Sequence, residues 1–157
     1  MRKLIGGRLS LAALIATTIV WATGWALAQD AAGSIASRKD HFHQIGTSFK
    51  AVMDETHAGS PDWQKIRSNA QMLAQLTSEI TTWFPAGSGP ESGAKTRAKA
   101  EIWTKGADFQ EDARLAHAAA QDLLKSASGN DVSVVAASVK ALGQRCASCH
   151  SEFREKE

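Results

Sequence analysis

The sequence lacks any stretch in which apolar and polar residues alternate over the length of a β-strand. It has only three prolines, and glycine is sparse outside the segment 85–93. Because proline and glycine disfavour helix interiors while the abundant alanine favours them, this composition predicts an all-α fold.

Patterns typical of several functional classes are also missing. The basic residues are scattered along the sequence, so nothing indicates a nucleic-acid-binding surface. No set of residues has the pattern of a nucleophile with a catalytic base, so we expect no enzymatic activity. The two cysteines have no second cysteine or histidine pair at the spacing of a zinc site.

The first 28 residues have the pattern of a secretory signal peptide. Three basic residues precede an apolar run over residues 9–20, and Ala-Leu-Ala at 26–28 is a small-x-small cleavage site. The apolar run is short for a membrane span, although an uncleaved anchor is the alternative. Cleavage after Ala28 would leave residues 29–157 as one exported, periplasmic domain. It would remove three basic and no acidic residues, leaving 15 basic and 16 acidic residues and a net charge of −1.

Apolar residues recur at spacings of three and four in four segments, which predicts four helices. The first spans about 35–56. The second begins near Ser60-Pro61-Asp62, with Ser60 as the N-cap, and ends at Phe84 before Pro85. The third spans about 95–126, and the fourth follows a break at 129–131. Four helices joined by short loops predict an antiparallel up-down-up-down four-helix bundle.

The only two cysteines lie near the end of the chain, in the run Cys146-Ala147-Ser148-Cys149-His150. Cys-x-x-Cys-His is the attachment signature of a c-type haem, in which two thiols bind the haem vinyl groups and the imidazole binds the iron. A redox dithiol is the main alternative, but it needs a strand before the motif. Both cysteines continue the apolar stripe of the last helix, so a haem held there would lie against the bundle interior.

Further residues along the mature chain, from about 35 to 157, match a known family. The matching residues are Arg38, Phe42, Ile45 and Gly46, then Trp83-Phe84-Pro85, then Glu101-Ile102-Trp103, and the C-terminal run from Cys146 to Arg154. With its haem motif on the fourth helix, the chain resembles cytochrome c′, the class II c-type cytochromes. The resemblance implies a four-helix bundle, commonly a homodimer, with one haem c attached through Cys146 and Cys149.

The resemblance also implies the surroundings of the haem. His150 would be the axial iron ligand, with Arg154 beside it, and Arg38 and Phe42 would lie on the cofactor-binding face of the first helix. Low-spin relatives have a methionine at the position of Phe42, which would face the other side of the iron. Phenylalanine cannot coordinate, so we expect a five-coordinate, high-spin haem open to small gases such as nitric oxide and carbon monoxide.

Two functions stay open for such a haem: gas binding, and electron transfer by a six-coordinate, low-spin iron. No charge run in the sequence marks a surface for a redox partner protein. His41 and His43 flank Phe42, where they either lie at the rim or supply a distal ligand.

Four other residues also have two interpretations. Met53 and Met72 are possible ligands in principle, but their apolar surroundings favour core packing. Gly46 either admits a large group close to the helix backbone or is a tolerated weak position. Arg154 either acts beside the iron ligand or is an ordinary cation near a helix end.

Overall fold

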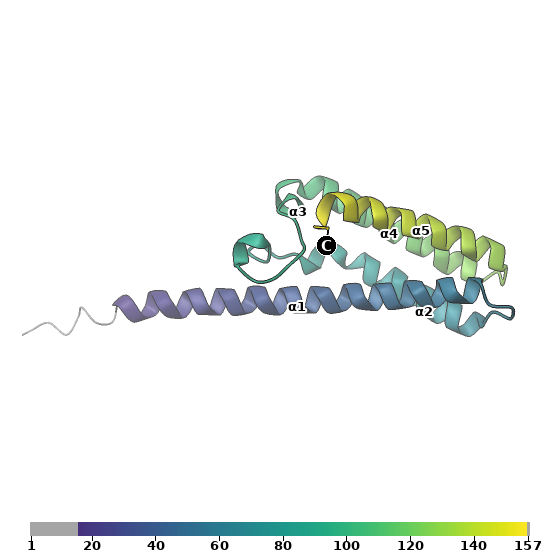
Figure 1. The fold of residues 1–157 in the computed structure, drawn as a ribbon, viewed down its shortest axis with the longest axis horizontal. Helices are drawn as coiled ribbons and strands as arrows, with labels where there is room; N and C mark the ends of the chain where they lie inside the picture. The colour runs from purple at the N-terminus through teal and green to yellow at the C-terminus, as the bar shows by residue number, and fades with distance from the viewer. Residues whose placement is uncertain (1–15, 157) are drawn as a thin grey trace, which may run out of the picture.

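The computed structural model describes the backbone of residues 16–156 and the side chains from residue 30 onward. Its body consists of four long helices, α1 (Ala16–Thr56), α2 (Trp63–Ser78), α4 (Gly106–Ala127) and α5 (Val132–Phe153). Helix α2 runs back along α1, and α4 and α5 pack on this pair (Figure 1). The predicted antiparallel four-helix bundle is confirmed.

Helix α1 begins at Ala16, well before the predicted start near residue 35, and its first half extends beyond the other helices (Figure 1). Residues 1–15 of the predicted signal peptide lie outside the described residues, so the cleavage after Ala28 stays a prediction. Among the described helices, none is both long enough and apolar enough to span a membrane.

The ends of α2 differ from the prediction. The N-cap is Asp62, not Ser60, because the Asp62 carboxylate accepts a hydrogen bond from the backbone N–H of Lys65 at 3.0 Å. The α-helix stops at Ser78, and the chain tightens into a short 3₁₀ helix, η2 (Ile80–Trp83). Tightening of the last turn satisfies carbonyl groups that a helix end leaves free.

The predicted third helix is wrong over its first turns. Residues 94–100 are largely extended, a single turn α3 (Glu101–Thr104) follows, and α4 starts only at Gly106. Ala98 forms an antiparallel bridge with Arg154, and the backbone N–H of Lys99 donates to the carbonyl of Phe153 at 3.1 Å. These contacts with the end of α5 outweigh the local helix propensity of the segment.

The last helix agrees with its predicted start and face. Asp131 caps α5, its carboxylate accepting from the backbone N–H groups of Ser133 and Val134. The buried residues of α5 are Val135, Val139, Leu142 and Phe153. Cys146 packs on one apolar cluster of the bundle and Cys149 on the other, so both cysteines face inward as predicted.

The loop at 85–93, which contains the 3₁₀ turn η3 (Pro90–Ser92), is anchored tightly at Gly89. A Cβ at this position would lie 2.8 Å from the Trp103 ring and against the Glu91 carboxylate. The Trp103 indole is itself fixed, because its N–H donates to the carbonyl of Phe84 at 3.2 Å. The loop and α3 therefore pack too closely at this point for any side chain.

We predict that Gly89→Ala lowers the free energy of unfolding by about 1–3 kcal/mol, because the ring must shift to admit the methyl group. Urea unfolding followed by circular dichroism measures the change. The control is Gly59→Ala, whose Cβ would meet nothing within 4 Å. Equal unfolding midpoints for the two variants would contradict the close packing.

Candidate functional site

A cavity of about 660 Å³ opens between the helices at the end of the bundle where α5 terminates. This volume lies within the range of about 300–1,000 Å³ that is usual for small-molecule and cofactor sites. Its walls are mainly apolar and come from all four long helices and from the segment 96–98. All six residues predicted for the haem site line it: Arg38, Phe42, Cys146, Cys149, His150 and Arg154.

Both cysteines are half-buried and not joined in a disulfide. Burial raises the pKa of the Cys146 thiol. Burial also raises the pKa of Cys149, to about 12, with a further contribution from the negative charge of Asp112. A redox dithiol needs a thiolate near neutral pH. The protonated, inward-facing thiols therefore do not support the dithiol alternative.

His150 is half-buried one residue beyond the second cysteine. Burial lowers its pKa, and the positive charges of Arg154 and Arg97 lower it further. The imidazole is consequently neutral at physiological pH, which is the form that binds metal ions.

Arg154 lies just beyond the last residue of α5, in extended conformation. Its guanidinium Nη1 is nevertheless 3.4 Å from Nδ1 of His150. Arg154 can donate to Nδ1 only in the tautomer that carries its proton on Nε2. Coordination of a metal by Nε2 would place the proton on Nδ1 and end this hydrogen bond. Arg154 is exposed and so has room to turn away.

Phe42 lies across the cavity from the motif, on α1. Its ring centroid is 6.5 Å from that of His150, with 67° between the planes. A planar group in van der Waals contact with a ring on each side needs the two rings to be about 7 Å apart. A shorter separation is enough where a coordinate bond replaces one of the two contacts. Edge contacts with Trp83 and Phe84, at 5.4 and 6.2 Å, hold the Phe42 ring in place.

The other candidate ligands differ in position. His43 is exposed and lines the cavity at its rim, as one interpretation predicted. His41 instead packs on Trp83, with ring centroids 4.5 Å apart, and is not part of the cavity lining. Met53 and Met72 are exposed and outside the lining, so the prediction that they pack in the core was wrong.

Arg38 is a buried cation in the cavity wall, with only 4% of its surface exposed. Its guanidinium donates to the Ser88 hydroxyl at 3.1 Å, the Ser88 carbonyl at 3.0 Å and the Thr96 hydroxyl at 2.9 Å. It also lies 4.4 Å from the centre of the Phe84 ring. Burial lowers its pKa. No ion pair with a carboxylate of the described residues accompanies these contacts, so an anionic group entering the cavity would be favoured here.

Gly46 lines the same cavity on α1, and a Cβ at this position would meet nothing within 4 Å. Gly46 is exposed, and this open space would accommodate a large group or a side chain alike, so both interpretations of the glycine stay open. An apolar space of this size, two inward thiols, a neutral imidazole and a buried cation together fit a haem c. The part of the wall formed by residues 96–98 was not predicted, because the helical spacing of apolar residues cannot reveal an extended segment.

Comparisons with known proteins agree with this geometry. The family profile described as Cytochrome C' matches residues 33–154. The cytochrome c' of Pararhodospirillum photometricum is 30% identical over 118 residues, which cover 75% of this chain and 93% of that protein.

Two solved structures share the fold. One is a cytochrome c' with a ligand-controlled dimer dissociation, with a TM-score of 0.75 at 21% identity over 80% of this chain and 97% of that one. The other is a nitric oxide complex of a variant cytochrome c prime from Alcaligenes xylosoxidans. It has a TM-score of 0.70 at 21% identity over 78% of this chain and 94% of that one.

We predict that Arg38→Met lowers the free energy of unfolding by about 1–3 kcal/mol, because it leaves the buried acceptors of Ser88 and Thr96 without their donor. The control is Arg67→Met, which removes an exposed arginine hydrogen-bonded to Asn130 at 3.0 Å and should cost less than about 0.5 kcal/mol. Urea titration of both purified variants compares them. An unchanged urea unfolding midpoint for Arg38→Met would show that the buried cation does not stabilise this wall of the cavity.

Proposed function

The chain belongs to the cytochrome c′ family, whose members bind haem c, and we propose that it is a periplasmic haem protein that binds small gases and exchanges electrons. Thioether bonds to Cys146 and Cys149 would hold one haem, with His150 as the iron ligand. The observation that carries this proposal is that both thiols and the imidazole open into one cavity opposite Phe42. Export by the predicted signal peptide would bring the chain to the compartment we propose.

A bound haem supplies an iron that accepts or releases one electron and coordinates a diatomic gas. The protein residues decide what reaches that iron. His150, kept neutral by burial and by Arg154 and Arg97, presents a nitrogen lone pair on one side. The buried guanidinium of Arg38 supplies positive charge for the propionate groups that every haem carries.

The opposite side is covered by Phe42, which has no atom that coordinates iron. We therefore propose a five-coordinate, high-spin haem. The aromatic wall of Phe42 and Phe84 offers no hydrogen-bond donor, so it does little to stabilise bound dioxygen. Nitric oxide and carbon monoxide are neutral and need no such donor. Either gas would enter by displacing the Phe42 ring.

A six-coordinate, low-spin electron carrier is the second candidate function. It is favoured by one observation: His43 lines the cavity from α1, one residue from Phe42. Its side chain is exposed, so ligation would require it to turn inward and bury its ring.

We propose in addition that the protein forms a homodimer, since the related cytochrome c' with ligand-controlled dimer dissociation is itself a dimer. Sedimentation of the purified protein tests this proposal separately. A monomer at all concentrations would refute it without affecting the haem site.

We predict that Phe42→Met converts the ferric protein from high-spin to low-spin, because a thioether at this position can bind the iron. If methionine occupies the iron in about 90% of molecules, the affinity for nitric oxide falls about tenfold. Electron paramagnetic resonance and nitric oxide titration measure the two effects.

The control is Phe49→Met, the same substitution at another cavity-lining residue of α1. Phe49 contacts the α5 side of the cavity near Gly143, so this variant should remain high-spin. A wild-type protein that is already low-spin would favour ligation by His43. A Phe42→Met variant that stays high-spin would place Phe42 away from the iron.

A further inference from the structure

The charged residues that line the cavity all have the same sign. Arg38, Lys39, Arg97 and Arg154 line it, and no aspartate or glutamate of the described residues does. They come from α1, from the segment 94–100 and from the end of α5.

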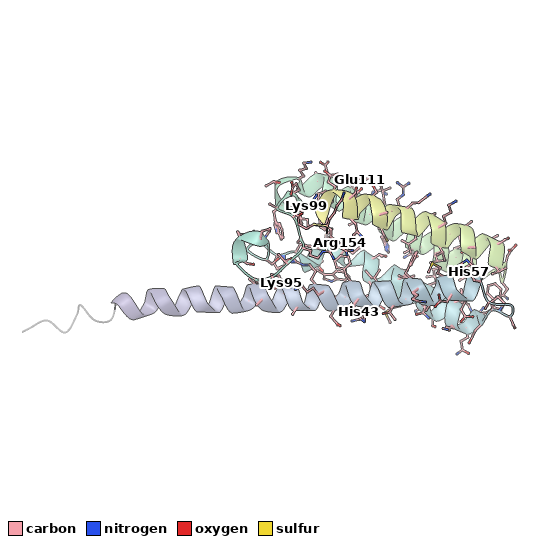
Figure 2. The ribbon with its side chains drawn as sticks, in the orientation of Figure 1. His43, His57, Lys95, Lys99, Glu111 and Arg154 are labelled. Carbon is pink, nitrogen blue, oxygen red and sulfur yellow. The ribbon has the colours of Figure 1, made fainter. Side chains whose placement is uncertain are left out.

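The positive charge continues onto the surface outside the cavity. Lys95, Arg97 and Lys99 alternate along the extended segment with Thr96 and Ala98, which are turned inward toward Arg38 and the core. Alternate residues of an extended chain point to the same side. Figure 2 shows Lys95, Lys99 and Arg154 at the end of the bundle opposite to His57. We call Lys39, Lys95, Lys99 and Arg154 the basic rim.

Contacts between the three segments hold the basic rim together. The ammonium of Lys39 donates to the carbonyl of Lys95 at 2.6 Å, which joins α1 to the extended segment. Lys99 reaches the carbonyl of Ser151 at 3.5 Å, and Arg97 donates to the carbonyl of Glu155 at 2.8 Å. Because the acceptors of Lys39 and Lys99 are neutral carbonyl groups, these contacts position the two ammonium groups without cancelling their charge.

Acidic groups nearby offset only part of this charge. Glu152 forms an ion pair with Lys105, which is not part of the basic rim, at 2.9 Å. Asp40 lies next to Lys39 and accepts a hydrogen bond from Gln44 at 2.8 Å, and the exposed Glu155 follows Arg154. Two haem propionates would neutralise two cations, of which the buried Arg38 would be one. The four cations of the basic rim and Arg38 outnumber Asp40, Glu155 and the two propionates, although the predicted mature chain has a net charge of −1.

On the basis of the proposed haem site, we infer that the basic rim is the docking surface for a redox partner protein with an acidic face. One electron passes between the haem iron and the partner's own redox centre at the cavity mouth, and no bond forms or breaks. Complementary charge steers such encounters and raises their rate. Lys39 and Arg154 of the basic rim also line the cavity that would hold the haem.

Stopped-flow oxidation of the ferrous holoprotein tests this inference, with two oxidants of opposite charge. Ferricyanide is an anionic probe and the tris(phenanthroline) complex of cobalt(III) is a cationic one. The test variant is Lys95→Glu with Lys99→Glu. The control is Lys125→Glu with Lys140→Glu, which makes the same change in net charge at exposed positions outside the cavity lining.

At about 10 mM ionic strength, where charges act over about 30 Å, we expect the test variant to react with ferricyanide about tenfold more slowly than wild type. The cobalt complex should react faster with it, and about 1 M salt should abolish both differences. The control should stay within about twofold of wild type. Poly-L-glutamate, as an acidic polypeptide, should inhibit the wild-type reaction with ferricyanide at low salt and not that of the test variant.

Equal effects of the two double variants, or a wild-type rate with ferricyanide that rises with salt, would overturn the inference. Binding to phosphatidylglycerol vesicles without competition by poly-L-glutamate would assign the basic rim to a membrane surface instead. Failure of the proposed function can be distinguished from failure of the docking inference. A purified protein without a haem absorbance band would refute the proposed function before any rate is measured.

Discussion

The buried guanidinium of Arg38 is the contact on which the cavity end of the molecule depends. It joins α1 to the loop at Ser88 and to the extended segment at Thr96. Held extended, that segment pairs with the end of α5 through Ala98 and Arg154. Burial of a cation is costly without partners. The three hydrogen bonds of Arg38 therefore stabilise the wall. Since no carboxylate of the described residues forms an ion pair with Arg38, an anion in the cavity is also favoured.

The opposite wall of the cavity is formed by α5, and its helical period determines which residues face the cavity. Spacings of three and four residues place Cys146 and Cys149 on the face that packs on the two apolar clusters, and His150 opens into the same space. Phe42 covers that space from α1, held by Trp83. We propose that Phe42 determines the function because its aromatic ring cannot coordinate iron and so leaves one side of the iron free for a gas.

The bundle could be predicted from the sequence because apolar spacing records which side of a helix faces the core. The cysteine motif could be placed in the same way, whereas the position of Phe42 opposite the iron ligand was implied by the resemblance to cytochrome c′. The segment 94–100 could not, because tertiary contacts from Arg38 and the end of α5 override its helix-favouring composition. The basic rim could not be predicted either, because its cations come from three separate segments and form no charge run in the sequence. Met53 was misplaced because an apolar residue at the edge of a helical stripe can remain exposed.

The absorbance spectrum of the purified protein, ferric and then ferrous, tests whether the chain carries a haem in the cavity opposite Phe42. We expect a Soret band from a haem that stays with the chain after denaturation, a high-spin ferric spectrum, and a change when nitric oxide is added to the ferrous form. Absence of a Soret band would contradict the haem site. A purely low-spin ferric spectrum with bis-histidine ligation would contradict the role of Phe42 as a cover that cannot coordinate.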